Sequence, residues 1–432
     1  MDYSQFLAMK QEIGLLIVFL IVFIYDTFFT RTSSEVVGQN GEGALTKPTL
    51  GALPVVSTIL FAIFTVYGFC PSLQEASVAF AGMYVTSPTI VAIKNILNIG
   101  VLIVMIQSIT WSGTEFTSIR RGEFYELILL TLFGMYFMIS SSNFLMFVIG
   151  LETASLPLCA LVAFDKHRYE SHEAAIKYVL TAIFSSAILL MGLSLLYGLT
   201  GTLYYEGIAM ALFGGEISVM LIIALAFVIA GFGFKLSLVP FHLWTADVYQ
   251  GAPTSVTSYL SVISKGSAAF AFLTVLFQVF GAFYTDVWEW MLYAIIILTI
   301  TVGNLFAIRQ RNMKRFMAFS SVSQAGYIML GIIAANTIGM ASMLFYILVY
   351  VFSNLGVFAV IAAIENKTGK VDMNDYDGLH KTNPWLSFTM TLGLFSLAGI
   401  PPFAGFFSKF MIFTATTSTG SIALYILVLI AL

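Results

Sequence analysis

Long apolar stretches separated by short polar connections follow one another along almost the whole sequence. Each is close to the ~20 residues that a helix needs to cross the hydrocarbon core of a bilayer. The stretches cover residues 13–30, 50–70, 88–111, 124–142, 144–164, 173–198, 218–243, 253–280, 288–308, 316–334, 338–364 and 384–416. Only 9% of the 432 residues are charged, against about 25% in an average soluble domain. The sequence therefore predicts an all-α protein that crosses a membrane many times.

A thirteenth apolar stretch begins near Thr419, but Leu432 follows too soon for a complete crossing. We therefore expect the chain to be incomplete at its C-terminal end. The longest connections, around 33–46 and 365–381, are too short to form a domain of their own. The predicted architecture is one membrane-embedded helical bundle.

Lysines and arginines gather in alternate connections, namely the first, third, fifth, ninth and eleventh. These bases are Arg31, Lys47, Arg120, Arg121, Lys166, Arg168, Arg309, Arg311, Lys314, Arg315, Lys367, Lys370 and Lys381. Cytoplasmic connections of membrane proteins are enriched in such residues, so we expect the odd connections in the cytoplasm and the N-terminus outside. Lys94, near the start of the third stretch, is ambiguous, and the seventh connection has Asp247 but no base.

Four charged residues fall inside apolar stretches rather than between them. They are Glu152, Lys235, Lys265 and Lys409. Each such charge costs about 2.5–3.5 kcal/mol at the centre of a membrane helix. Lysines that reach the membrane surface or form inert buried ion pairs are the alternative explanation. Three central lysines with one central glutamate instead favour a proton-transfer role.

Prolines stand beside two of these lysines. Pro240 follows Lys235 by about one turn, and Pro401 and Pro402 precede Lys409. A proline breaks the hydrogen-bond pattern of a helix, and such breaks persist in membranes where protein or a wet cavity surrounds them. Burial favours the neutral form of a lysine, whereas a nearby carboxylate favours the charged form. Glu152 is therefore predicted to switch lysine protonation. For the prolines, a simple kink that serves helix packing is the alternative explanation.

Further polar residues are candidates for a proton relay between the buried charges. They are Ser264 in a hydroxyl-rich segment before Lys265, Gln324, Tyr327, and His242 near the expected cytoplasmic end of its stretch. Residues of this kind also serve close helix packing. Glu173 and Lys177 stand four residues apart, which favours a local ion pair and leaves a lateral relay open.

The sequence contains no glycine-rich phosphate loop, no paired cysteine motif for an iron–sulfur cluster and no evident pair of haem ligands. Its four histidines and two cysteines are too scattered to predict a metal site. The energy for proton movement is therefore expected to come from partner subunits.

Several motifs resemble those of a known family. The segments are GLETASLPLCALVAF, EAAIKYVLTAIFSSAILLMG, GFGFKLSLVPFHLWTADVYQGAPTSVTSYLSVISK, MKRFMAFSSVSQAGYIMLG and LAGIPPFAGFFSKF. They are similar to the subunit N family of bacterial NADH–quinone oxidoreductase (respiratory complex I), the counterpart of mitochondrial subunit 2. The match runs from about Gly150 to Lys409. A lysine at Lys409 favours the N type over the related M type, and L-type chains add a long lateral helix.

The resemblance implies an antiporter-like fold of fourteen helices with two inverted five-helix repeats and with helices 7 and 12 broken. About thirteen helices are visible here: residues 1–123 hold helices 1–3, residues 124–280 the first repeat (helices 4–8), and residues 288–432 the second (helices 9–13). By motif, the proton-transfer residues of the family correspond to Glu152, Lys235, Lys265 and Lys409.

The resemblance also implies a proton-translocating membrane-arm subunit, driven by quinone reduction elsewhere in the complex. Such a chain is a translocase subunit without a redox centre or cofactor of its own, while FMN, iron–sulfur clusters and quinone belong to partner subunits. The expected partners are the antiporter-like M and L types, the small K and J types and membrane lipid, with no nucleic acid. The expected location is the bacterial inner (plasma) membrane. A subunit of a multisubunit cation/proton antiporter, or a structural scaffold, is the alternative.

Overall fold

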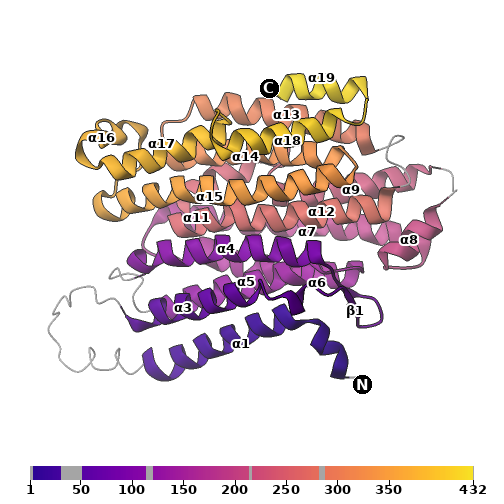
Figure 1. The fold of residues 1–432 in the computed structure, drawn as a ribbon, viewed down its shortest axis with the longest axis horizontal. Coiled ribbons are helices and arrows are strands. Elements are labelled where there is room, and N and C mark those ends of the chain that lie inside the picture. Colours follow the sequence, from indigo (N-terminus) through magenta and orange to yellow (C-terminus); the bar gives the residue numbers. More distant parts are fainter. Residues whose placement is uncertain (1–2, 31–50, 113–119, 214–216, 282–287, 432) are drawn as a thin grey trace.

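A computed structural model describes residues 3–30, 51–112, 120–213, 217–281 and 288–431 of the chain. Long helices run side by side along the long axis of the molecule (Figure 1). The α-helices, long and short, are α1 (Lys10–Tyr25), α3 (Ala52–Tyr67), α4 (Pro88–Trp111), α5 (Arg121–Ile139), α6 (Phe144–Val162), α7 (Tyr169–Thr200), α8 (Tyr205–Leu212), α9 (Val219–Leu236), α10 (Leu243–Gly251), α11 (Thr254–Tyr259), α12 (Lys265–Phe280), α13 (Glu289–Ile308), α14 (Met313–Ile333), α15 (Thr337–Thr368), α16 (Leu379–Thr382), α17 (Pro384–Ala398), α18 (Ala404–Thr417) and α19 (Ile422–Ala431). The predicted bases Arg31 and Lys47 lie outside the described residues.

Short elements connect or interrupt these helices. The 3₁₀ and π segments are η1 (Tyr3–Ala8), η2 (Asp26–Thr30), η3 (Pro71–Leu73), η5 (Leu260–Ser264) and η8 (Met373–Tyr376). Two short antiparallel strands, β1 (Ser77–Ala79) and β2 (Tyr84–Thr86), form a hairpin between α3 and α4. This hairpin is the only sheet among the described residues.

Ten helices of the described chain are long and apolar enough to cross a membrane, and α3, α17 and α19 are shorter apolar helices. The chain is therefore an all-α, multi-pass membrane protein, as its apolar stretches predict. The grouping into two inverted five-helix repeats stays a prediction.

The predicted stretch 218–243 is in fact two helices. Helix α9 ends at Leu236, Ser237 takes a left-handed conformation with φ 61°, and α10 adds nine more helical residues. The Val239 amide, which is outside any helix, donates to Thr299 Oγ1 at 3.0 Å. The Phe234 carbonyl accepts from Trp244 Nε1 at 3.2 Å. Because neighbouring side chains satisfy these backbone groups, the break is stable inside the bundle.

The predicted stretch 384–416 is likewise interrupted, between α17 and α18. Gly399 has φ 84°, which favours glycine, and the two prolines follow it. The Gly405 amide donates to Ser396 Oγ at 3.2 Å. A third irregularity lies in the stretch 253–280, where the π segment η5 separates α11 from α12.

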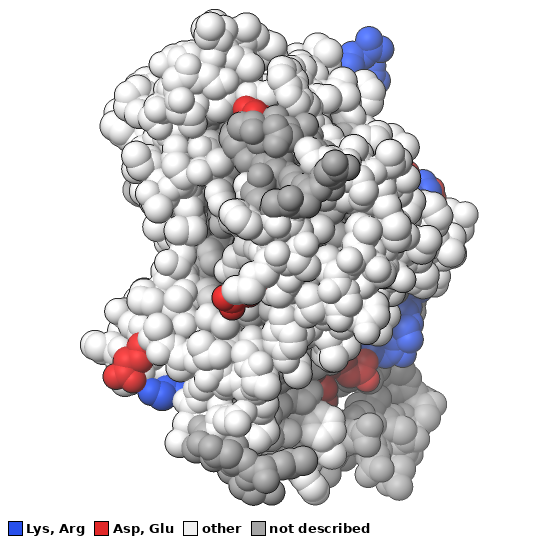
Figure 2. Space-filling model, turned by 90° about the vertical axis from the view of Figure 1, so that its right-hand side faces the viewer, with Lys and Arg blue, Asp and Glu red and all other residues white. Residues whose placement is uncertain are grey.

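The bundle has two distinct ends. At the hairpin end, the bridge Tyr84–Ser141 joins the β1–β2 hairpin to connection 140–143, and the bridge Asn143–Tyr204 joins that connection to connection 201–204. At the basic end lie connections 163–168, 309–312 and 369–383, each of which holds two lysines or arginines. Figure 2 looks onto the hairpin end, which presents mostly uncharged atoms.

Helices α5 and α6 pack backbone to backbone through two glycines. A Cβ atom at Gly134 would lie 2.3 Å from the Ala154 amide nitrogen, and one at Gly150 would lie 2.5 Å from the Met138 amide nitrogen. Small residues at such contacts let membrane helices approach closely. This contact holds α6, which carries Glu152, against the rest of the bundle.

We predict that Gly134→Ala destabilises the membrane domain by about 1–3 kcal/mol, because the added methyl group meets backbone that cannot move aside. Thermal unfolding of the purified complex in detergent, followed by thiol-reactive fluorescence, would measure the change. Gly356→Ala is the matched control, since a Cβ there meets no atom within 4 Å. Equal melting temperatures for the two variants would contradict the prediction.

Candidate functional site

Helices α6, α9, α12 and α18 each bring one of the four predicted charged residues into the bundle. Glu152 lies on α6, Lys235 at the end of α9, Lys265 at the start of α12, and Lys409 on α18. The two broken helices and the π segment η5 stand directly beside the three lysines. Lys235 and Lys265 therefore lie next to such an irregularity, whereas Lys409 lies inside α18 and its side chain reaches back to the break.

The Lys235 ammonium is held by α6. Its Nζ donates to Ser155 Oγ at 2.5 Å, and that hydroxyl donates in turn to the Leu151 carbonyl at 2.5 Å. Among the described residues Glu152 makes no ion pair with Lys235, yet its carboxylate interacts electrostatically with the ammonium. Ser155, which the sequence analysis did not select, thus supplies the direct contact, one turn away from Glu152.

Lys265 is almost completely buried, with 1% of its surface exposed. Its Nζ donates to Ser321 Oγ at 2.8 Å and lies 5.7 Å from the centre of the Tyr249 ring. Neither partner carries a formal charge. Tyr249 belongs to α10, and sequence reasoning missed it because the predicted stretch stopped before that helix.

His242 lies at the break itself, directly before α10, and it is 7% exposed. The prediction that it stands near the end of its span is wrong, because the nine residues of α10 follow it. Its imidazole interacts electrostatically with Lys265. Neither ring nitrogen of His242 has a hydrogen-bond partner among the described residues, so the buried imidazole is available at the break that follows Lys235.

Lys409 uses the backbone that the second break exposes. Its Nζ donates to the Ala398 carbonyl at 3.1 Å, at the end of α17, and lies 4.2 Å from the centre of the Tyr327 ring. Gln324 donates to the neighbouring Leu397 carbonyl at 3.2 Å and accepts from the Tyr346 hydroxyl. The structure thus brings Gln324, Tyr327 and Lys409 together.

A small cavity separates Lys409 from the centre of the bundle. Its volume is about 10 Å³, close to the minimum that a single water molecule needs. Its polar lining consists of Gln324, Tyr346, Tyr350, Ser353, Ser396, Ser408 and Lys409. Ser353 and Ser396 share a hydrogen bond of 2.7 Å.

The hydroxyl groups before Lys265 mostly bond to their own helix. Ser258 donates to the Thr254 carbonyl at 2.9 Å, and Ser261 donates to the Ser258 carbonyl at 2.8 Å. The Ser264 carbonyl accepts from Ser267, while no bond joins the Ser264 hydroxyl to a lysine in the part of the chain that is described. These contacts favour the packing explanation for this segment.

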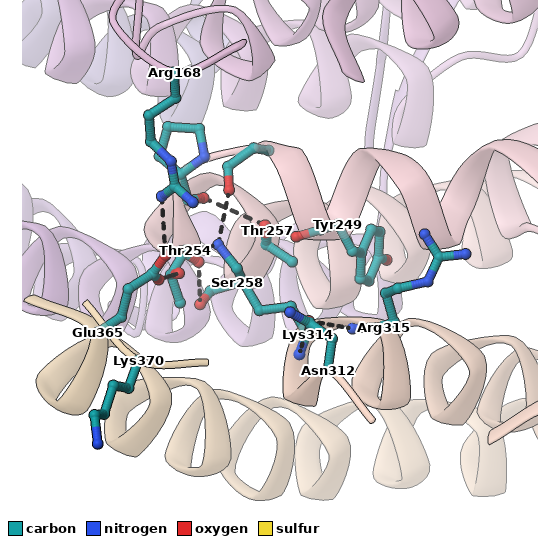
Figure 3. Close-up of polar contacts among 12 residues, drawn as sticks. Arg168, Tyr249, Thr254, Thr257, Ser258, Asn312, Lys314, Arg315, Glu365 and Lys370 are labelled. Carbon is teal, nitrogen blue, oxygen red and sulfur yellow. Dashed lines mark hydrogen bonds and ion pairs between the residues drawn. The ribbon is translucent and has the colours of Figure 1, made fainter. Parts of the chain in front are cut away.

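A partly buried ion cluster lies at the basic end (Figure 3). Glu365 of α15 accepts from Arg168 and Lys314, each at 3.0 Å, and from the Thr254 hydroxyl. The assignment of Lys314 to a connection is wrong, because it lies in α14 and has no exposed surface. The sequence signal that was overlooked is Asn312, a residue type that often caps the start of a helix. Its side chain caps α14 by accepting a hydrogen bond from the Lys314 amide at 3.0 Å.

A second ion chain at this end joins α7, α10 and α14. Lys177 lies 2.7 Å from Glu173 and 2.5 Å from Asp247, and Arg315 lies 2.7 Å from Asp247. Arg315 too lies in α14 and not in a connection. The predicted local pair of Glu173 and Lys177 is present, but Lys177 also ties α7 to α10. The placement of Asp247 in a connection is wrong, because it lies in α10, where it pairs with bases of α7 and α14.

Glu152 is not the only carboxylate inside the bundle. Glu12 of α1 is 1% exposed and pairs with Lys94 of α4 at 2.6 Å. The sequence left Lys94 ambiguous and gave no sign of Glu12, since an acid near the start of a chain is usually solvated.

Glu152, Lys235, Lys265 and Lys409 form a central row from α6 to α18. With their neighbours they offer amines, hydroxyls, an imidazole and a carboxylate. Within the described ranges, His, Cys, Asp and Glu side chains form no group of three or more that could hold a metal ion. The chemistry that this part of the chain offers is proton donation and acceptance.

Comparison with known proteins agrees with the motifs. The family described as "NADH:quinone oxidoreductase/Mrp antiporter, TM" matches residues 141–432. NADH-quinone oxidoreductase subunit N of Phocaeicola vulgatus is 50% identical over 433 residues, covering 100% of this chain and 86% of the relative. Its namesake from Rhodospirillum rubrum is 37% identical, covering 86% of this chain and 78% of the relative.

Two solved structures share the fold. A chain of respiratory complex I from Thermus thermophilus with bound aureothin is 26% identical, with a TM-score of 0.76 over 98% of this chain and 86% of that chain. A chain of the Mrp complex from Dietzia sp. DQ12-45-1b is 22% identical, with a TM-score of 0.80 over 98% of this chain and 77% of that chain. Family, sequence relatives and fold agree, and the chain belongs to the subunit N family of NADH–quinone oxidoreductases.

Proposed function

We propose that this chain is a proton-translocating membrane-arm subunit of NADH–quinone oxidoreductase, and that Glu152, Lys235, Lys265 and Lys409 transfer the protons. The observation that carries the proposal is that each lysine amine contacts a polar partner at or near an irregularity of the helical backbone. Interrupted helices in membranes are typical of ion paths. Inert buried lysines would not need this arrangement three times.

Glu152 and Lys235 supply the switch. The carboxylate favours the charged amine when it is close, and desolvation favours the neutral amine when the carboxylate withdraws. A tenfold change in proton occupancy requires only about 1.36 kcal/mol. Ser155 keeps the amine in place in both states, because a hydroxyl donates to a neutral amine as readily as it accepts from an ammonium.

His242 and the Gln324–Tyr327 group extend the path in the two directions. His242 lies at the break that follows Lys235, and the small cavity is lined by both Gln324 and Lys409. The ion cluster of Glu365 has no such freedom, because its three donors hold it in place. Glu173 and Lys177 act as part of the fixed ion chain rather than as a relay.

The redox chemistry belongs to other chains of the complex. We assign FMN, iron–sulfur clusters and quinone to partner subunits, and this chain acts as a translocase subunit without a redox centre. Its neighbours in the membrane arm are the antiporter-like M and L types and the small K and J types. The complex lies in the bacterial inner membrane, with the basic end of this chain in the cytoplasm.

We predict that Lys235→Ala lowers both quinone reductase activity and proton pumping to about a tenth or less, since positioned proton-transfer groups typically contribute 10²–10⁴-fold in rate. Both activities fall because coupled steps affect each other. Glu152→Gln acts in the same direction but more mildly. NADH oxidation and a pH-sensitive dye in inverted vesicles measure the two rates, and Lys166→Gln, on an exposed connection, is the control.

Normal pumping by an assembled Lys235→Ala complex would refute the proposal and leave a scaffold role. Exchange of Na⁺ or K⁺ for protons, without NADH-driven activity, would instead identify a cation/proton antiporter. Purification with flavin- and iron–sulfur-bearing partners would separate these outcomes.

We predict that Ser155→Ala also slows pumping, because a hydrogen bond to a charged group contributes about 1.5–3 kcal/mol. The loss should be smaller than that of Lys235→Ala. Ser185→Ala is the matched control, since Ser185 is a buried serine that bonds only the Gly231 carbonyl, at 3.2 Å. Equal pumping rates for the two serine variants would show that Ser155 has no part in the path.

The proposed orientation predicts which surface cysteines react from which side. In a Cys70→Ser, Cys159→Ser background, Glu75→Cys at the hairpin end should react with a membrane-impermeant thiol reagent in intact spheroplasts. Lys367→Cys at the basic end should react only in inverted vesicles. Both positions are exposed. The reverse pattern would place the N-terminus in the cytoplasm.

A further inference from the structure

A buried ion pair lies at the hairpin end, apart from the four proposed proton-transfer residues. Glu12 Oε1 and Lys94 Nζ are 2.6 Å apart, and the two residues are 1% and 0% exposed. Removing two charges from water costs several kcal/mol per ion, and apolar residues of similar size often stabilise a fold equally well. The pair therefore calls for an explanation beyond stability.

Toward the centre of the bundle, the pair continues into further polar groups. Lys94 Nζ lies 5.0 Å from the centre of the Tyr136 ring, and the Tyr136 hydroxyl donates to Asn98 Oδ1 at 2.5 Å. Tyr136 also interacts electrostatically with both Glu12 and Tyr259. Tyr259 directly precedes the π segment η5, which leads to Lys265.

Helix α4 brings these groups against the segment of Lys265. An ideal Cβ at Gly266 would lie 3.2 Å from the Leu97 side chain, so α4 touches the residue that follows Lys265. Asn98, the next residue on α4, is fully buried, and its Nδ2 has no hydrogen-bond partner among the described residues. Buried amide donors almost always have a partner, so this one is suited to exchange with water.

Toward the surface, the pair reaches an open pocket. The Tyr84 hydroxyl donates to Glu12 Oε2 at 2.9 Å. Tyr84 and Gln11 line a cavity of about 420 Å³ at the hairpin end, whose rim includes Lys10 and Glu75. Gln11 is also buried, and its Oε1 has no partner within the described part of the chain.

We propose that Glu12 and Lys94 form a second proton-transfer site, which links the Lys265 segment to the surface at the hairpin end. The proposal rests on the proposed function of the chain and adds an outward branch to it. A simple clamp that fastens α1 and the hairpin to α4 would explain the ion pair. It would not explain the unpartnered amides on both sides or the pocket that reaches Tyr84.

The transfer conserves charge at every step. The Lys94 ammonium gives a proton to the Glu12 carboxylate, which leaves a neutral amine and a carboxylic acid. The Tyr84 O–H then rotates from Glu12 Oε2 toward water in the pocket, and Glu12 passes its proton to the Tyr84 oxygen as that oxygen gives its own proton to the water. Lys94 regains a proton from the Asn98 side, so that one proton has moved outward and the ion pair is restored.

Glu12→Gln in the assembled complex tests the branch. Glutamine keeps the size of the side chain and one acceptor oxygen for Lys94, while its amide NH2 can donate to the Tyr84 oxygen, so the contacts of a mere clamp would be largely preserved. We expect loss of a protonated carboxylic acid band from the infrared difference spectrum during NADH oxidation. We also expect fewer protons pumped per NADH. An assembled variant with the same spectrum and the same proton/NADH ratio as the unmodified complex would overturn the proposal.

Tyr84→Phe provides a second test if Glu12→Gln fails to assemble. It removes only the hydroxyl between Glu12 and the pocket, so the carboxylic acid band should persist but decay more slowly. Tyr205→Phe is the matched control, since Tyr205 is a buried tyrosine at the same end whose hydroxyl contacts Ser141 at 3.1 Å. Equal decay in the two tyrosine variants would overturn the proposal.

The result for Lys235→Ala distinguishes failure of the proposed function from failure of the outward branch alone. If that variant pumps normally, the proposed function itself fails. If it loses pumping while Glu12→Gln and Tyr84→Phe behave like the unmodified complex, only the outward branch fails.

Discussion

Charge inside a membrane bundle needs a polar partner, and this requirement shapes the centre of the molecule. Each of the three lysines of the central row has a neutral polar partner. Lys235 uses the Ser155 hydroxyl, Lys265 uses the Ser321 hydroxyl, and Lys409 uses the Ala398 carbonyl. All three partners are neutral, so they stabilise the ammonium less than a carboxylate would. A lysine held in this way keeps access to its neutral form, which proton transfer requires.

The interruptions of the helices provide the room for these contacts. A regular helix satisfies its own carbonyls, so it has none to offer an amine in the interior. The break before α18 exposes the carbonyl that Lys409 uses, whereas Trp244 takes the carbonyl exposed at the end of α9. The two breaks therefore serve their lysines differently. At Lys235 the break mainly places His242 and α10 beside the row.

Ion pairs with full charges lie away from the central row and divide into two kinds. At the basic end, Glu365 and Asp247 each contact two bases, which fixes α7, α10, α14 and α15 relative to one another. At the hairpin end, Glu12 has one base and one tyrosine hydroxyl. A carboxylate with several cationic partners holds its charge firmly, while one with a single partner is easier to protonate. Glu365 and Asp247 are therefore suited to a rigid scaffold, and Glu12 is suited to a proton-transfer site.

The sequence by itself determined the membrane class, the approximate helices and the four central charges, because apolar length and misplaced charges are local properties. It could not supply Ser155, Tyr249, Glu365 or Glu12, since a serine, a tyrosine or a terminal acid becomes special only through a partner on another helix. It also misplaced Lys314, because a base near a connection looks solvated until α15 covers it. Tertiary structure decided these pairings, because partners on different helices meet only after the helices pack.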